Sequence, residues 1–566
     1  MPPSPSPPAC PFFARWRWIP PLLLGVWMTG CASLPSEVDR PVSTALADPT
    51  ETRIGRAVQA RAAQAETHND SGFALVNSAE LAFTSRMALI SASEKTLDIQ
   101  YYAIHADETT LRMFDALRAA AARGVRIRIL LDDFNTAGKN AQVLKLAFEK
   151  NIELRLFNPL PGGRGSLFFR ILGSLKDMDR LQRRMHNKIF VADNAVAITG
   201  GRNLGETYFG QGEGTNFIDA DVLAAGRIVR ELSRSFDLYW NNPLAYPVES
   251  LMTAAQLEAM KPPPAAGLPA GQIKPVNGET SAAAGGNITG GAPAKPARPA
   301  VRKVTALDGS VSVADPLPDS TNLALLEWTW APSTLLVDKA SKIAADADAV
   351  EASQDTTVDG LLQLMAEAKS DLLIVSPYFV PGRRMMDQLA AIRQKHVRIR
   401  VLTNSLASND APAAHVGYAR YRKDLLGLGI ELYEMRAEQE STLSGFSSLG
   451  SSGSAGGSRA SLHAKIVVLD DSLLVVGSMN LDLRSQLQNS EVALVIRSRK
   501  LAADTTRLIE PALAKGAYKV ELENGQLIWR APQGSQLKDS RTEPDASLGL
   551  KLMLTLIGPL APDEML

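Results

Sequence analysis

The stretch Met185-His186-Asn187-Lys188-Ile189-Phe190-Val191 recurs in the second half of the chain as Leu462-His463-Ala464-Lys465-Ile466-Val467-Val468. Each copy is a His-x-Lys motif with an aspartate five residues after the lysine, at Asp193 and Asp470. The apolar run after each lysine is typical of a strand buried in a sheet. Because side chains two residues apart on a strand share a face, we expect each copy to present an imidazole beside an ammonium group.

The repeat extends well beyond these motifs. Residues 97–102 are echoed by 372–378, residues 124–130 by 396–402, and residues 152–154 by 430–432, in the same order. A strand, a helix over residues 110–122 and a second strand over residues 125–131 predict a βαβ unit in the first copy. The shared order and spacing predict an α/β fold of two similar lobes, related by a pseudo-two-fold axis, with a common site where they meet.

Composition sets the other expected boundaries. A chain of 566 residues is too long for one hydrophobic core. Polar composition predicts a tether, and segments rich in Pro, Ala, Gly or Ser predict a linker and a mobile loop. We therefore expect a tether over 32–75, lobe 1 over 76–260, a flexible linker over 261–303, lobe 2 over 304–520 with a mobile loop at 438–457, and a tail over 521–566.

Residues 1–31 are typical of a lipoprotein-type signal peptide. Arg15 and Arg17 precede a short apolar run, and Met28-Thr29-Gly30-Cys31 resembles the lipobox of bacterial lipoproteins. We expect Cys31 to be lipidated and the protein to face the periplasm of a Gram-negative bacterium from the inner or outer membrane. An ordinary signal peptide or an uncleaved anchor is the alternative. The other cysteine, Cys10, lies in the same segment, so the folded body contains neither a disulfide nor a Cys-rich zinc site.

Two histidines, two lysines and two asparagines at equivalent positions suit phosphodiester chemistry. One imidazole can attack phosphorus, and the other can protonate the leaving alcohol and then deprotonate the incoming one. We favour His186 as the nucleophile and His463 as the acid/base, although the near-symmetry of the repeat leaves the reverse assignment open. The phosphate oxygens would be held by Lys188, Lys465, Asn203 and Asn480. This chemistry needs no metal or other cofactor.

Carboxylates are expected to orient the two imidazoles. The candidates are Asp219 or Asp221 in the first half and Glu491 in the second. Asp193 and Asp470 complete the candidate catalytic set, but we expect them to close the turn after each strand rather than to contact substrate. His105 and His415 are further candidates for substrate contact, with a structural role as the alternative.

The duplicated pattern resembles the HxKxxxxD signature of the phospholipase D superfamily over residues 75–520. Residues 184–188, 200–209 and 404–410 are most similar to bacterial cardiolipin synthases of the C type. The resemblance implies a pair of α/β/α sandwiches and a covalent phosphohistidine intermediate. It also implies a phosphatidyltransferase that makes cardiolipin from phosphatidylglycerol and a second phospholipid, with phosphatidylethanolamine as a candidate donor. Hydrolysis of phospholipids to phosphatidic acid is the alternative, and we expect the monomer to be active.

Charge and composition favour a lipid over a nucleic acid as substrate. Lys plus Arg and Asp plus Glu each number 60, and aromatic residues make up 6% of the chain. A nuclease of the same superfamily is expected to have a basic groove and stacking aromatic residues. The apolar and basic run 166–176 and the apolar stretch 548–560 are candidates for contact with a membrane surface, with packing between lobes as the alternative.

Overall fold

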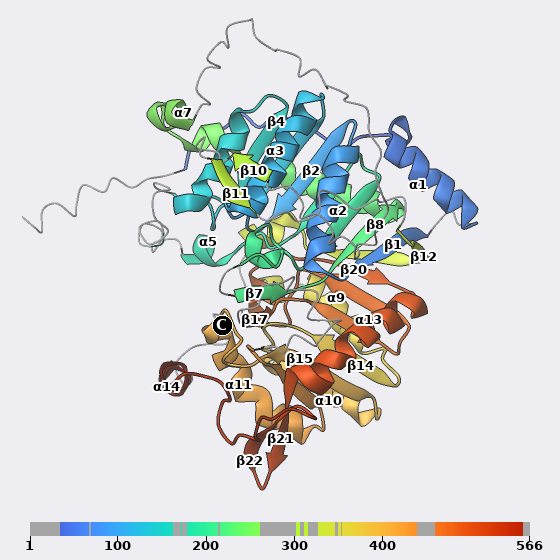
Figure 1. The fold of residues 1–566 in the computed structure, drawn as a ribbon, viewed down its shortest axis with the longest axis vertical. Coiled ribbons are helices and arrows are strands. Elements are labelled where there is room, and N and C mark those ends of the chain that lie inside the picture. The colour runs from blue at the N-terminus through green and yellow to red at the C-terminus, as the bar shows by residue number, and fades with distance from the viewer. Residues whose placement is uncertain are drawn as a thin grey trace, which may run out of the picture.

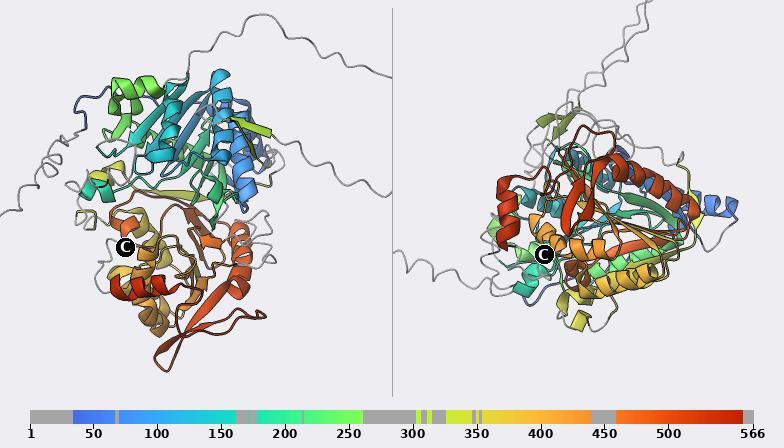
Figure 2. Two further views of the ribbon diagram at one scale, coloured as in Figure 1. Left: turned by 60° about the vertical axis from the view of Figure 1, so that its left-hand side comes forward. Right: turned by 90° about the horizontal axis from the view of Figure 1, so that it is seen from below.

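The computed structural model describes two α/β lobes that lie one above the other along the long axis of the molecule (Figure 1). It describes residues 34–260 and 326–557, except for 67–69, 162–170, 172–177, 213–214, 346–348, 352–353 and 439–458, together with a hairpin at 302–305 and 311–314. Each lobe is built on a nine-stranded sheet. The views in Figure 2 show helices on the outer faces of both sheets.

The sheet of lobe 1 joins strands that are far apart in the sequence. Its order is β12 (Thr329–Ala331), β1 (Ser71–Val76), β8 (Asp221–Gly226), β6 (Val196–Gly200), β5 (Ile189–Ala192), β2 (Thr96–Tyr101), β3 (Arg126–Asp132), β4 (Ile152–Phe157) and β9 (Ala245–Pro247). Strands β2, β3 and β4 are parallel, as the predicted βαβ unit requires. The main helices are α2 (Ala79–Ala92), α3 (Glu108–Ala122) and α6 (Arg227–Trp240).

The sheet of lobe 2 repeats this arrangement. Its order is β13 (Ser333–Val337), β20 (Val492–Ile496), β19 (Leu473–Gly477), β18 (Ile466–Leu469), β14 (Asp371–Val375), β15 (Arg398–Asn404), β16 (Glu431–Met435), β21 (Ala517–Glu523) and β22 (Gln526–Arg530). Its main helices are α9 (Thr357–Met365), α10 (Gly382–Gln394), α11 (Pro412–Gly427) and α13 (Arg499–Pro511). The run from β13 to β21 matches the run from β1 to β9 strand by strand, which confirms the predicted pair of similar lobes.

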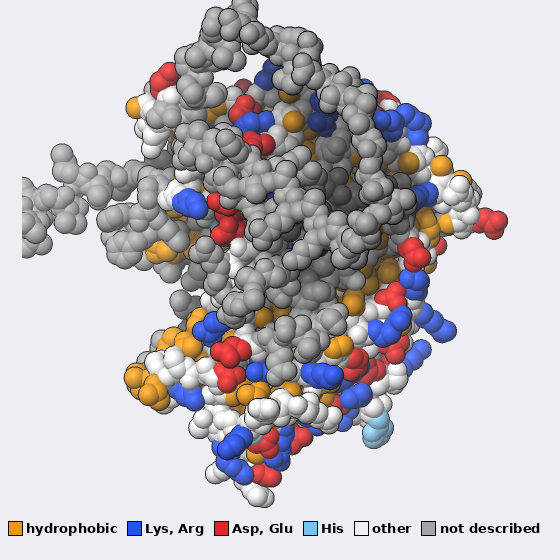
Figure 3. All heavy atoms as spheres, in the orientation of Figure 1, with side chains coloured by type: hydrophobic (Ala, Val, Ile, Leu, Met, Phe, Trp, Pro, Cys, Tyr) orange, Lys and Arg blue, Asp and Glu red, His pale blue; other side chains and the backbone are white. Residues whose placement is uncertain are grey.

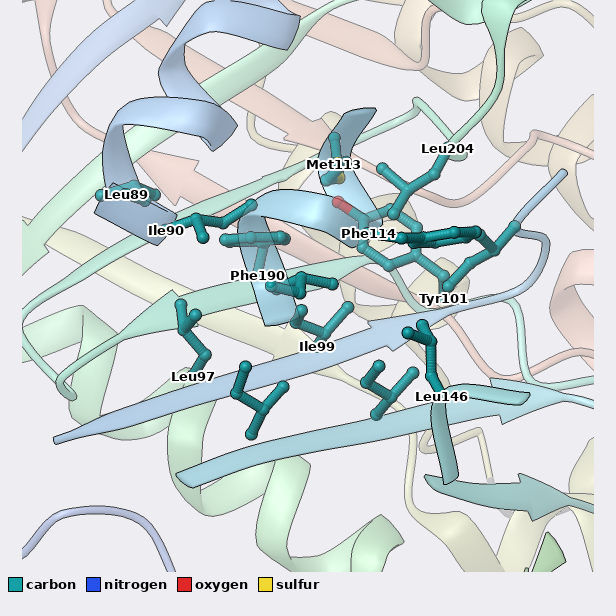
Figure 4. Close-up of a cluster of buried hydrophobic side chains, with 14 of the residues drawn as sticks. Leu89, Ile90, Leu97, Ile99, Tyr101, Met113, Phe114, Leu146, Phe190 and Leu204 are labelled. Atoms are coloured by element: carbon teal, nitrogen blue, oxygen red, sulfur yellow. The ribbon is translucent and has the colours of Figure 1, made fainter. Parts of the chain in front are cut away.

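The cores explain why the sequence forms these layers. Figure 4 shows Leu97, Ile99 and Tyr101 of β2 in one apolar cluster with Met113 and Phe114 of α3. Burying each such side chain contributes about 1.5–3 kcal/mol. A second cluster contains buried residues of both lobes, among them Val191, Ile218, Ile466 and Leu494. The two lobes are therefore joined by a continuous apolar core, which holds their motifs in a fixed relation.

The expected tether over 32–75 is wrong for most of its length. Residues 40–45 lie against lobe 1, where Arg128 donates to the carbonyl of Ser43 at 2.9 Å and Arg155 donates to that of Pro41 at 2.6 Å. Helix α1 (Arg53–Gln64) and strand β1 follow. The physical reason is that two buried guanidinium groups need acceptors, and this polar segment supplies them.

Two expected domain boundaries also differ from the structure. The chain passes from the sheet of lobe 1 to that of lobe 2 between β12 and β13, so lobe 2 begins near residue 333 rather than 304. The expected tail contains β22 and α14 (Leu548–Ile557), and the boundary at 521 falls inside β21. Residues 1–31, nearly all of the linker 261–303 and of the loop 438–457, and the run 166–176 apart from residue 171 lie outside the described residues.

Candidate active site

Each His-x-Lys motif lies in an extended segment that leads into a strand, not on the strand itself as expected. His186 and Lys188 precede β5, and His463 and Lys465 precede β18. The reason is that both segments pair across the lobe boundary. The amide of His186 donates to the carbonyl of Ser490 at 2.9 Å.

The motif of lobe 2 pairs with lobe 1 in the same way, since strand β17 (Arg459–Leu462), which precedes this motif, runs parallel to β7 (Thr215–Ile218). The amide of His463 then donates to the carbonyl of Ile218 at 2.8 Å. The residue after Ile218 is Asp219, and the residue after Ser490 is Glu491. The backbone pairing therefore sets a carboxylate of each lobe beside the histidine of the other.

The two carboxylates bind the imidazoles crosswise. Nδ1 of His186 lies 2.9 Å from Oε2 of Glu491, and Nδ1 of His463 lies 2.6 Å from Oδ2 of Asp219. Of the two candidates in the first half, the structure brings Asp219 and not Asp221 to an imidazole. Asp221 is instead a buried partner of Arg86, at 2.9 Å. Sequence reasoning had not foreseen that the pairs would cross between lobes.

The glycine directly before Arg202, Gly201, is explained by the carboxylate of Asp219. A Cβ atom at Gly201 would lie 2.1 Å from Oδ1 of Asp219, so only glycine fits there. The equivalent residue of lobe 2 is Ser478, whose hydroxyl donates to Glu491. Ser485 donates to the same carboxylate at 3.0 Å. Each half of the site therefore has one carboxylate beside a histidine, but serine hydroxyls contact Glu491 whereas a glycine lies against Asp219.

The two lysines form a shared cationic centre. Lys188 Nζ donates to the carbonyl of His186 at 2.7 Å, and Lys465 makes the equivalent contact with His463. Burial lowers the pKa of Lys188 to about 7, Glu491 opposes the shift, and the charge of Lys465 lowers it further. Burial likewise lowers the pKa of Lys465. The two buried ammonium groups repel each other, so an anion such as a phosphodiester that binds beside both of them would stabilise their charged forms.

The electrostatics keep both imidazoles close to neutral and both carboxylates ionised. Burial lowers the pKa of His186 to about 4, against the opposing effect of Glu491, and it also lowers that of His463. The pKa of Asp219 is about 2, because His463, Lys465 and Arg202 outweigh the effect of its burial. The ionised carboxylates accept from Nδ1–H, which leaves Nε2 of each ring as a base or nucleophile.

Aromatic rings that sequence reasoning did not identify form the walls of the site. Tyr102 packs edge-on against His186 with ring centroids 5.1 Å apart. Tyr208 and Phe217 pack against His463, at 5.3 and 5.1 Å. Asn203 donates to the hydroxyl of Tyr208 at 3.0 Å, so one of its two amide hydrogens is used to position that ring rather than to hold phosphate.

Lobe 2 adds a carboxylate that breaks the symmetry of the site. The hydroxyl of Tyr378 donates to Asp410 at 2.8 Å, and the charge of Asp410 opposes part of the burial that lowers the pKa of both His463 and Lys465. Asn480, the other expected phosphate ligand, has a buried Oδ1 with no hydrogen-bond partner among the described residues. The sequence could have indicated Asp410 as a site residue, because it follows the end of strand β15 and sites in open α/β sheets lie beyond the carboxyl ends of the strands.

Four other candidates lie outside the reacting centre. Asp193 accepts from the amides of Glu94, Lys95 and Thr96 at 2.8–2.9 Å, and Asp470 binds the start of β14 in the same way. Both aspartates tie a turn to the beginning of a strand, so their place in the catalytic set is structural. His415 is buried against Glu543, at 3.5 Å, and His105 stacks behind Tyr208 with ring centroids 6.3 Å apart.

Two lobes that each give one His-x-Lys motif to a common centre define a member of the phospholipase D superfamily. The family model described as "Cardiolipin synthase, PLD-like domain" matches residues 87–240 and 361–511. The chain is 34% identical to cardiolipin synthase C of Escherichia coli over 487 residues, covering 86% of this chain and 94% of that protein. The chain belongs to this PLD-like cardiolipin synthase family.

Two further comparisons extend over most of the chain. An uncharacterised protein of Helicobacter pylori is 29% identical over 536 residues, covering 93% of this chain and 95% of that protein. The crystal structure of phosphatidylserine synthase from Haemophilus influenzae has a TM-score of 0.53 at 13% identity and covers 90% of this chain and 100% of that chain. This likeness supports the two-lobed fold.

Proposed function

We propose that this phospholipase D-superfamily enzyme transfers a phosphatidyl group between two alcohols through a covalent intermediate on His186. Nε2 of His186 attacks phosphorus, and the bond from phosphorus to the donor head-group oxygen breaks. That oxygen takes a proton from His463. In the second half-reaction His463 removes the proton of an acceptor hydroxyl, whose oxygen attacks phosphorus and releases His186.

The single observation that supports this proposal best is the crossed pair of histidine–carboxylate contacts beside two buried lysines. Burial keeps His186 unprotonated at neutral pH and so available as a nucleophile. His463 is the better candidate for the acid, because its contact with Asp219 is the shorter of the two and the charges of Asp219 and Asp410 offset part of the burial that lowers its pKa. The lysine ammonium groups supply the positive charge that stabilises the five-coordinate phosphorus.

The substrates follow from the family rather than from the geometry. The relative from Escherichia coli is named cardiolipin synthase C. By analogy we propose that phosphatidylglycerol is the acceptor, that phosphatidylethanolamine or a second phosphatidylglycerol is the donor, and that cardiolipin is the product. Because the lysines provide the charge stabilisation, we expect full activity in EDTA.

Membrane attachment is a separate part of the proposal. We propose that Cys31 is lipidated and that the enzyme works from a membrane on the periplasmic side. Among the described residues, none of the helices has the length and apolar character needed to cross a bilayer. The lipobox-like sequence Met28-Thr29-Gly30-Cys31 supports the lipid anchor.

The test of the reaction is product analysis with labelled phospholipids. Purified enzyme is incubated with vesicles that contain phosphatidylglycerol alone, phosphatidylethanolamine alone, or both, and the lipids are resolved by chromatography. The proposal predicts labelled cardiolipin whenever phosphatidylglycerol is present. Phosphatidic acid without cardiolipin in every mixture would show a hydrolase, and cleavage of DNA without turnover of either lipid would show a nuclease.

A further inference from the structure

The surface of helix α14 carries an unusual concentration of exposed leucines. Leu548, Leu552 and Leu556 are 86%, 59% and 60% exposed, and they are half of the six exposed large hydrophobic residues among those the structure describes. They lie four residues apart, so they form one stripe along the helix. Figure 3 shows hydrophobic side chains gathered at this place, at the side edge of the lower lobe.

The helix is held so that this stripe faces outward. Its opposite side packs on α11, and the segment that leads into it is fixed by Glu543, which forms a buried ion pair with Arg422 of α11. Asp545 accepts a hydrogen bond from Tyr518 at 3.0 Å. The helix is thus attached to lobe 2 with Leu550, Met553 and Leu554 partly buried and with the three leucines of the stripe exposed.

The position of α14 relates it to the site and to the start of the described chain. Helix α11, on which it packs, begins at Pro412, two residues after Asp410 of the site. In the views of Figures 1 and 2, the dark-blue start of the described chain lies on the same side of the molecule as α14. The α14 leucines are therefore exposed on the side of the molecule on which the described chain starts.

We propose that the α14 stripe, formed by Leu548, Leu552 and Leu556, docks the enzyme on the surface of a phospholipid bilayer. The inference rests on the proposed function, since phospholipid substrates are held in a bilayer. A ten-residue helix is about 15 Å long and cannot span one, but an apolar stripe of this kind can enter the boundary between head groups and acyl chains. A second copy of the chain is a poorer occupant, because three leucines offer far less than the roughly 1,200 Å² that a specific interface buries.

The first test reads the position of α14 without depending on catalysis. The native cysteines, Cys10 and Cys31, both lie outside the described body. An environment-sensitive fluorophore is placed on Leu552→Cys in a full-length chain that also carries Cys10→Ser and Cys31→Ser, so that only the introduced thiol reacts. The matched control is Leu238→Cys in the same background, at another exposed leucine in helix α6 of lobe 1. With vesicles of phosphatidylethanolamine and phosphatidylglycerol, we expect a blue shift and quenching by brominated lipid only at position 552.

No change at position 552, or an equal change at 238, would overturn the docking proposal. A blue shift that needs no vesicles and grows with protein concentration would also overturn it, because it would show a second copy of the chain on the stripe. These outcomes say nothing about cardiolipin synthesis, so failure of docking and failure of the proposed function remain distinguishable.

The second test compares two physical forms of the substrate. Leu552→Glu combined with Leu556→Glu should lower activity on vesicles by roughly tenfold or more, because the stripe must enter the bilayer for the enzyme to reach these substrates. The same double variant should keep its activity on monomeric short-chain phospholipids, which require no docking. Leu238→Glu should change neither activity. Unchanged activity of the double variant on vesicles, or an equal loss on both substrates, would contradict the proposal.

Discussion

Glu491 of the second lobe accepts a hydrogen bond from Nδ1 of His186 of the first, at 2.9 Å, and Asp219 makes the reciprocal contact with His463. Neither lobe therefore contains a complete histidine–carboxylate pair. The parallel pairing of each motif with the segment before the opposite carboxylate enforces this arrangement. We therefore expect catalysis to depend on the docking of the lobes as well as on the motifs.

The first prediction concerns Glu491→Gln. Glu491 raises the pKa of Lys188, which is about 7, so loss of its charge should lower that pKa further and remove the ammonium charge at lower pH. The basic limb of the profile of kcat/KM against pH should therefore move to lower pH. The rate itself should fall by about a hundredfold or more, because His186 loses its orienting anion.

Rates measured between about pH 5 and 9 on a soluble short-chain phospholipid check this prediction. Glu431→Gln is the matched control, because it makes the same substitution in a surface ion pair with Arg398. An unshifted basic limb in Glu491→Gln would mean that Glu491 does not act on the lysine.

The second prediction exploits the difference between the two halves of the repeat. Gly201→Ser gives lobe 1 the residue found at Ser478 in lobe 2, but its Cβ would meet Asp219 at 2.1 Å. We expect a fall in kcat of about a hundredfold from displacement of that carboxylate. The reverse change, Ser478→Gly, removes one hydrogen bond to Glu491 and should cost much less.

Asp219→Asn tests the cause of that loss. Added to Gly201→Ser, it should cause little further loss, because both changes remove the same contact with His463. Wild-type activity of Gly201→Ser would contradict this role of the glycine.

The third prediction separates the motif aspartates from the chemistry. Asp193 is buried and accepts from three backbone amides, so Asp193→Asn should lower the free energy of unfolding by about 2 kcal/mol. The kcat of the folded enzyme should stay within a few-fold of the wild type. Denaturant unfolding and initial rates on the same preparation provide the measurement. A catalytic loss as large as that of His186→Ala, with unchanged stability, would place Asp193 in the reaction after all.

The fourth prediction concerns the anchor at Cys31. Acyl chains stabilise membrane attachment by roughly 0.8 kcal/mol for each buried methylene, so the mature protein should sediment with membranes. Cys31→Ala should yield an unprocessed or mislocalised form. Mass spectrometry of the mature N-terminus is the decisive measurement, and an unmodified N-terminus at another residue would rule the anchor out.

Much of the fold could be predicted because the sequence is duplicated. Two copies of one pattern, centred on His186 and His463, indicated two lobes and a shared site. That each histidine lies on the same side of the chain as the lysine two residues later follows from the geometry of an extended segment alone. The lobe boundaries were less accessible. Strand β12 joins lobe 1 through pairing with β1, which sets Ser71 opposite Ala331, and no local sequence pattern reveals a contact between segments so far apart in the chain.

The sequence predicted which residues form the candidate site but not which of them contact each other. The carboxylates Asp219 and Glu491 were identified by type, while their crossed pairing depends on backbone hydrogen bonds between lobes. The aromatic walls, such as Tyr102 and Tyr208, carry no polar signature and resemble core residues in the sequence. The segment over residues 40–45 was misjudged because polar composition does not distinguish a free tether from one that satisfies buried arginines.

The most direct test of the account is to trap the covalent intermediate and map it. Enzyme is mixed with a phospholipid labelled in its phosphatidyl group, quenched within a turnover under conditions that preserve phosphohistidine, and digested for mass spectrometry. His186→Ala and His463→Ala, which should both be folded and without turnover, serve as controls. We predict a phosphatidyl adduct on His186 in the wild type and no adduct in His186→Ala, whereas an adduct found only on His463 would contradict the assignment of the nucleophile.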